Sequence, residues 1–274
     1  VSYDTTEITL NETDIAWEIK GEGFEIRIDK IMGEILSGRY KEYMVFTGGP
    51  NLHVLTRGDK ILSSIYEINN IASKETVENT SVQKKQNSVY VSRNLTSDSL
   101  KAQINYIIHS NGSIQTDYSI QNLPENYIRE IGLEFRLSES IDSISWKRKG
   151  YWPYYPTEHL SSLSGRVPVR IESDESYGKN PGMPWHYQVK DYYYKGLNHQ
   201  DYKYNMSRTV RSSKTNILEY SIHFGNSDSL TVIGSGEKAC RLSTDETGKY
   251  LIINNYWDYP GSGNEMWFKK ILPE

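Results

Sequence analysis

The sequence is poor in cysteine and lacks long apolar runs. Cys240 is the only cysteine among 274 residues, so neither an intrachain disulfide nor a zinc site built on cysteine pairs can form. We expect Cys240 to be a small core residue rather than a nucleophile. No stretch approaches the ~18 consecutive apolar residues of a membrane span, and no basic-then-apolar secretion signal opens the chain. We therefore expect no membrane partner, and leave the location open between bacterial cytoplasm and periplasm.

Clustered basic charge is also missing. The formal net charge is -4 and the longest basic run is Lys147-Arg148-Lys149. Nucleic-acid binding requires clustered lysine and arginine to displace counterions, so we expect no nucleic-acid partner.

Aromatic side chains that carry a polar group are abundant. The chain has 22 Tyr and 6 Trp against only 5 Phe. Such rings suit both the faces of a β-sandwich and the stacking surfaces that hold sugars. Their number alone does not choose between these roles.

Apolar residues recur with a period of two, which indicates strands rather than helices. The clearest hairpin covers residues 102–121, where alternation on both arms flanks Ser110-Asn111-Gly112. Asn-Gly supplies the positive φ that a tight turn needs. Further alternating runs cover residues 23–30, 131–137, 218–224, 238–243 and 250–254.

These runs predict an all-β sandwich or barrel with few or no helices. No charge-dense linker or internal repeat divides the chain, so we expect a single domain over residues 1–274. Residues 1–20 are expected to be a lead-in from a missing upstream domain. Between about Trp146 and Arg211 the alternation fades, and aromatic residues, Pro and Gly dominate. We expect ordered loops there, at one end of the sandwich, and place Trp146 itself in the core.

Several aromatic residues are candidates for sugar contact, because a ring can stack on the apolar face of a sugar while polar neighbours bind its hydroxyls. The strongest group follows a predicted strand on a Gly-rich stretch, and consists of Trp257, Asp258 and Tyr259. The remaining candidates stand beside Pro, Gly or polar residues, and are Trp152, Tyr155, Trp185 and Trp267.

No complete catalytic apparatus is recognisable. Glycoside hydrolysis needs two carboxylates that flank the scissile bond, and such a pair has no spacing rule by which sequence could reveal it. A sugar mutarotase would use a His and a carboxylate, but none of the six His stands in a catalytic signature. The chain contains no G-x-S-x-G, P-loop or H-E-x-x-H motif. We expect no catalytic residue, metal or cofactor.

Short segments in a fixed order resemble a known family. Residues 23–37 contain a strand, Asp29-Lys30, a turn Gly33 and a second strand, and Gly49-Pro50 precedes another apolar strand. The likeness continues through segments that lie in order along the chain: Leu123-Pro124, residues 131–135, Trp146, Gly150, residues 163–165 and residues 211–217. Together they resemble the C-terminal domain of family 2 glycoside hydrolases of the β-galactosidase type.

The resemblance implies a galactose-mutarotase-like supersandwich of antiparallel sheets. It also implies an upstream catalytic (β/α)₈ barrel in the same polypeptide, which carries both catalytic glutamates and acts on a β-glycoside. This domain would line the edge of the sugar pocket with a C-terminal Trp, for which Trp257 and Trp267 both qualify. The family's Gly-Arg-Gly-Pro-x-Glu-Asn-Tyr run keeps only Tyr155 here, which predicts a divergent subgroup acting on another β-glycoside.

Two other functions remain open from the sequence. One is a free-standing aldose mutarotase or epimerase on the same fold. The other is a non-catalytic module that binds polysaccharide or a neighbouring domain.

Overall fold

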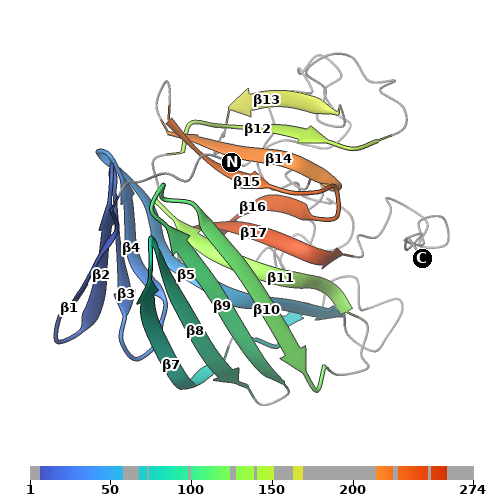
Figure 1. Cartoon of the computed structure of the whole chain (residues 1–274). Coiled ribbons are helices and arrows are strands. Elements are labelled where there is room, and N and C mark those ends of the chain that lie inside the picture. The colour runs from blue at the N-terminus through green and yellow to red at the C-terminus, as the bar shows by residue number, and fades with distance from the viewer. Residues whose placement is uncertain are drawn as a thin grey trace. The chain divides into compact units, whose positions relative to one another are not determined.

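The computed structural model describes residues 7–57, 68–72, 74–97, 100–123, 128–138, 141–150, 163–168, 214–224, 228–245 and 248–257. Its described residues form seventeen strands and no helix, and the strand pairs whose register is defined in these residues are antiparallel (Figure 1). The expected all-β, antiparallel fold class is therefore confirmed.

The chain divides into two compact units. Unit 1 comprises Val1–Leu52, Ile71–Glu125 and Leu133–Glu139, and unit 2 comprises His53–Asn70, Asn126–Gly132 and Ser140–Glu274. Strands β5 (Tyr43–Arg57) and β11 (Ile128–Leu137) contribute residues to both units.

Unit 1 contains two sheets. The first is part of a nine-stranded sheet and runs in the order β1-β2-β3-β4-β5-β11 in this unit. Its outer strands are β1 (Thr9–Glu12), β2 (Ala16–Gly21), β3 (Phe24–Asp29) and β4 (Ile35–Tyr40). The second follows the order β10-β9-β8-β7, and contains β7 (Thr76–Lys85), β8 (Ser88–Thr96), β9 (Lys101–His109) and β10 (Ile114–Gln121). In the predicted hairpin, Gly112 adopts φ +79° at the turn between β9 and β10.

The core of unit 1 lies where the two sheets face each other. Alternation along β8 and β9 buries one face of each strand, including Val91 and Ile104, and β3 presents Phe24 and Ile28 in the same way. The Tyr106 hydroxyl of β9 donates to the Gly33 carbonyl between β3 and β4 at 2.7 Å. Burial of these apolar side chains, at about 25 cal/mol per Å², is the main force holding the sheets together.

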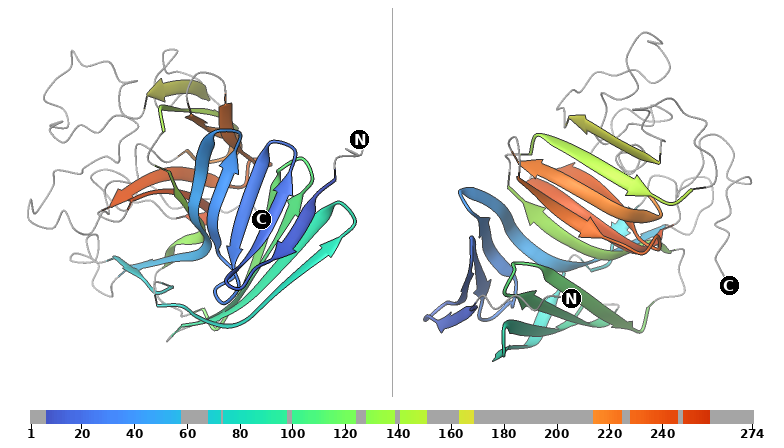
Figure 2. Two further views of the ribbon diagram at one scale, coloured as in Figure 1. Left: turned by 90° about the vertical axis from the view of Figure 1, so that its left-hand side faces the viewer. Right: turned by 45° about the horizontal axis from the view of Figure 1, so that its top comes forward.

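In unit 2 the nine-stranded sheet extends beyond β11 with β17 (Gly248–Trp257) and then β16 (Ala239–Asp245). The short β6 (Ile68–Asn70) pairs with β5. A further sheet has the order β13-β12-β14-β15, and contains β12 (Ser143–Arg148), β13 (Ser164–Pro168), β14 (Ile217–Phe224) and β15 (Asp228–Ile233). Both sheets are shown from two further sides in Figure 2.

Two expectations for unit 2 have definite outcomes. Trp146 on β12 is 2% exposed, so its predicted core position is confirmed. The expectation of loops throughout residues 146–211 is wrong at Ser164–Pro168, because this segment pairs with β12 as an antiparallel strand. The remaining residues of that region, 151–162 and 169–213, lie outside the described part of the chain.

Candidate functional site

Strand β17 positions the one predicted sugar-contact residue that the structure describes. Trp257 ends the strand and is half-buried, whereas Asn254 is fully buried. Successive side chains of a strand point to opposite faces, so Asn254 and Tyr256 share one face and Trp257 lies on the other. The ammonium of Lys238 donates to Asn255 Oδ1 at 3.0 Å, which ties the exposed side of this strand to the approach to β16.

The other predicted sugar-contact residues lie outside the described residues: Trp152, Tyr155, Trp185, Asp258, Tyr259 and Trp267. The structure therefore neither groups them with Trp257 nor separates them from it.

A buried ionic cluster lies beside β17 and was not anticipated from the sequence. Glu130 of β11 is completely buried, and its Oε2 lies 2.6 Å from Nε2 of His53 on β5. Arg241 of β16 donates to both Glu130 oxygens, from Nε at 3.2 Å and from Nη2 at 2.8 Å. We name these three residues the Glu130 cluster.

The electrostatics of the Glu130 cluster keep the carboxylate charged. Burial alone would raise the pKa of Glu130, but the Arg241 guanidinium and the His53 ring overcome this effect and hold it well below its usual range. His53 and Arg241 are each only 3% exposed. All three side chains are buried, and their contacts join strands β5, β11 and β16.

The cluster also fixes the strand that leads to Trp257. Arg241 is directly opposite Ile252 on β17, so its side chain shares a face with Asn254. At Gly132, two residues after Glu130, an added Cβ would lie 2.0 Å from the Ile253 carbonyl oxygen. Only glycine allows β11 and β17 to approach this closely.

A second buried cation of unit 2 lies against an aromatic ring. Lys214 is 2% exposed, and its Nζ lies 4.7 Å from the centroid of the Trp146 ring. Burial, assisted by the positive charge of Arg148, lowers the pKa of Lys214 to about 7. Its backbone pairs with Cys240, so this contact belongs to the core.

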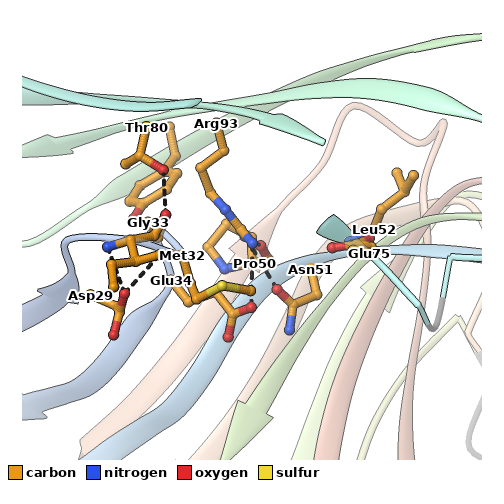
Figure 3. Close-up of polar contacts among 12 residues, drawn as sticks. Asp29, Met32, Gly33, Glu34, Pro50, Asn51, Leu52, Glu75, Thr80 and Arg93 are labelled. Atoms are coloured by element: carbon orange, nitrogen blue, oxygen red, sulfur yellow. Dashed lines mark hydrogen bonds and ion pairs between the residues drawn. The ribbon is translucent and has the colours of Figure 1, made fainter. Parts of the chain in front are cut away.

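Unit 1 contains a third polar cluster, centred on Arg93 (Figure 3). Arg93 projects inward from β8 and is 0% exposed. Its Nη1 donates to the Pro50 carbonyl and to Asn51 Oδ1, and its Nη2 donates to Glu34 Oε1 at 3.3 Å. These contacts connect the second sheet of unit 1 with the β3–β4 turn and with β5.

Glu75, just before β7, completes the surroundings of Arg93. One of its carboxylate oxygens accepts the Leu52 backbone N–H at 3.2 Å. Burial raises the pKa of Glu75 to about 7, although Arg93 opposes this shift. A half-buried carboxyl that titrates near neutrality makes this contact sensitive to pH.

The sequence carried one usable signal for these clusters. Arg93 occupies an inward position of an alternating strand, between Val91 and Leu95, and an inward charge marks a buried polar site. Glu130 gave no such signal, because it occupies the face of β11 opposite Leu133 and Phe135, which alternation assigns to solvent.

Two classes of site find no support in the described part of the chain. Its His, Cys, Asp and Glu side chains form no group of three that could hold a metal ion. It also contains no helix that is long and apolar enough to cross a membrane.

Comparison with known proteins gives the family. No curated protein matches the chain. The family model for the beta galactosidase small chain matches residues 20–177, which is 158 of the 274 residues. The matched segment begins in β2 and passes through all of unit 1 after that strand. The all-β fold and this match over more than half of its length together show that the chain belongs to the beta-galactosidase small chain family.

Proposed function

We propose that the chain is the C-terminal accessory domain of a family 2 β-glycosidase and lines the edge of its sugar pocket. The observation that carries the proposal is the small-chain match over residues 20–177. In this proposal the two catalytic glutamates lie on an upstream (β/α)₈ barrel of the same polypeptide, and the substrate is a β-glycoside.

Trp257 is the described residue best suited to the pocket edge. It ends β17, is half-buried, and lies on the face opposite Asn254. An indole can stack on the apolar face of a sugar ring. The Glu130 cluster supports this role indirectly, because it holds β11 and β16, the two neighbours of β17.

The proposal extends to the predicted residues around Trp257 and in the aromatic stretch, which would contact the same sugar: Asp258, Tyr259, Trp267, Trp152, Tyr155 and Trp185. A mutarotase is the weaker alternative. Acid–base catalysis requires groups that reach the substrate, and the His53–Glu130 pair is buried.

The test compares three purified proteins with o-nitrophenyl β-galactoside as substrate. They are the chain alone, the catalytic part of a β-galactosidase without its small chain, and that catalytic part fused to this chain. We expect turnover only from the fusion. Hydrolysis by the chain alone would refute the accessory role, and so would a fusion no more active than the truncated enzyme.

Within an active fusion, Trp257→Ala should raise KM for the galactoside about fivefold or more, because one stacking contact is worth about 1 kcal/mol or more. Trp257→Phe retains a ring and should stay within about threefold of the parent fusion. Equal kinetics for both variants and the parent would place Trp257 outside the pocket.

A further inference from the structure

The outer face of the second sheet of unit 1 is not used by the proposed function. Its strands, β7 to β10, bury Val89, Val91, Ile104 and Ile108 on one side. Because side chains alternate, the residues between them point the other way. In Figure 1 strands β8 to β10 are drawn in front of β5, so the face of this sheet that is turned away from β5 is toward the viewer.

Strand register arranges the outer side chains in rows across the sheet. One flanking row contains Lys85, Ser88 and His109, and the other contains Thr96, Lys101 and Gln121. Three central rows lie between them. The first row contains Gln83, Tyr90, Ile107 and Gln115. The second row contains Ser81, Ser92, Asn105 and Asp117. The third row contains Asn79, Asn94, Gln103 and Ser119. We name these twelve residues the polar face. All of them are exposed or half-buried.

The polar face has little charge. Asp117 is the only ionic side chain among its twelve residues, although the whole chain has 31 basic and 35 acidic residues in 274. The two lysines of this sheet face, Lys85 and Lys101, stand in the flanking rows, so the three central rows themselves offer a charged partner little complementary charge. When an uncharged partner binds to the polar face, few charged groups of the protein have to be desolvated.

Its hydrogen-bonding groups are also largely unused. Within the polar face the structure shows one side-chain hydrogen bond, from Gln103 Nε2 to Ser92 Oγ at 3.3 Å. The carboxamides that remain available to a ligand are those of Asn79, Gln83, Asn94, Asn105 and Gln115. Each carboxamide both donates and accepts, and sugar hydroxyls require that combination.

Tyr90 supplies the aromatic surface on this face. It is 39% exposed in the first row, one row away from Asn105. The Lys85 ammonium lies 5.3 Å from the centroid of its ring, which orients the ring at the edge of the carboxamide array. Neighbouring strands are about 4.8 Å apart, so four strands present groups over a width of about 14 Å, enough for more than one sugar ring.

We propose that the polar face is a binding surface for an uncharged polysaccharide, separate from the pocket edge at β17. A flat, solvated sheet face gives weak binding, and several rings of one glycan chain would contact its three rows together. The neutral array of carboxamides and hydroxyls beside Tyr90 carries this proposal. It does not depend on the accessory role proposed above, because it uses no residue of β17.

Native electrophoresis of the full chain in gels containing a soluble, neutral β-linked galactan tests this inference. We expect retardation that grows with galactan concentration and none in gels containing polygalacturonate, which is the charged counterpart. The chain should be made in a bacterial host, because Asn79 and Asn94 each begin an Asn-x-Ser/Thr sequence that other hosts can glycosylate.

Matched variants locate the binding. Tyr90→Ala and Asn105→Ala should each weaken retardation about fivefold or more, since each removes one ring contact or hydrogen bond. Tyr40→Ala and Asn11→Ala are the controls and should behave like the parent. Tyr40 is 40% exposed with Lys41 Nζ 5.1 Å from its ring centroid, and Asn11 is exposed on β1.

Three results would overturn the proposal. The first is migration of the parent chain that neutral galactan does not change. The second is a Tyr90→Ala variant whose retardation equals that of the Tyr40→Ala variant, whether both are weakened or both are unchanged. The third is concentration-dependent dimerisation of the parent that Tyr90→Ala abolishes, because the polar face would then be a contact between copies of the chain. Circular dichroism of both alanine variants at β8 and β9 verifies that they fold.

Discussion

At the residue scale, Cys240 illustrates how burial controls reactivity. It lies on β16 with 0% exposure, and its backbone pairs with Lys214. Burial raises the pKa of its thiol, an effect that the nearby Lys238 only partly offsets. The reactive form of cysteine is the thiolate, so we expect Cys240 to react little in the folded chain.

We therefore predict that a chromogenic disulfide reagent titrates no thiol in the native chain and one thiol per chain in concentrated urea. Absorbance of the released leaving group measures both states. Cys240→Ser is the control and should give no signal in either state. Rapid reaction of the native chain would contradict the buried position of this side chain.

The Glu130 cluster permits a second prediction at this scale. Removing one member of a buried ion pair leaves its partner charged and desolvated, which typically costs about 3–5 kcal/mol. Glu130→Leu should therefore lower the free energy of unfolding of unit 2 by about that amount, since Arg241 loses both of its hydrogen bonds to Glu130. Urea unfolding at neutral pH measures the loss.

The double variant Glu130→Leu with Arg241→Met separates charge burial from packing. It removes both charges from the cluster, so we expect it to recover a large part of the lost stability. Additive losses in the double variant would show that the two residues act independently, contrary to their contact at 2.8 Å.

At the scale of elements, β11 and β17 depend on a close backbone approach at Gly132. A Cβ there would lie 2.0 Å from the Ile253 carbonyl oxygen and 2.7 Å from the Asn254 Cα. Both neighbours are backbone atoms, which cannot rotate away as a flexible side chain can. The two strands would have to move apart.

Gly132→Ala should consequently destabilise the chain by about 3 kcal/mol, the upper end of the usual cost of overpacking. Gly48→Ala on β5 is the matched control, because its added Cβ would meet the Cβ of exposed Arg136 at 3.1 Å. We expect that control to lose about 1 kcal/mol or less. Thermal unfolding of the two variants gives the comparison, and equal midpoints would contradict the close approach.

Seven of the seventeen strands in the described residues could be predicted from the alternation of apolar residues, but the sheets could not. These strands are β3, β9, β10, β11, β14, β16 and β17. Alternation did not locate β7, whose residues are polar and largely exposed. An edge strand buries few side chains, so its period-two signal is weak.

The candidate sites were less predictable for a related reason. Trp257 could be selected because it is aromatic, has aromatic and polar neighbours in the sequence, and lies at the end of a strand. His53 and Glu130 are separated by 77 residues and meet only because β5 and β11 are neighbours. Strand order is a property of the assembled sheet, and it cannot be predicted from a single sequence.

At the scale of the whole molecule, the two units contain groups with opposite responses to pH. In unit 1 the pKa of Glu75 is raised to about 7. Its contribution is therefore fully present below its unfolded pKa of about 4.5 and is lost as pH rises through about 7. In unit 2 the pKa of Lys214 is lowered from 10.5 to about 7, so its folded state is stabilised as pH rises through that interval.

We predict that a change from about pH 5.5 to about pH 8.5 destabilises unit 1 and stabilises unit 2, each by about 2 kcal/mol. Hydrogen exchange followed by mass spectrometry measures both units in one sample, after correction for the intrinsic dependence of exchange on pH. Peptides from β8 and β9 report on unit 1, and peptides from β12 and β14 report on unit 2.

Glu75→Gln should remove the pH response of unit 1 alone, and Lys214→Met should remove that of unit 2 alone. Glu78→Gln, an exposed change on β7, should leave both responses intact. If the protection of both units changed in the same direction, the buried positions of Glu75 and Lys214 would not be the cause.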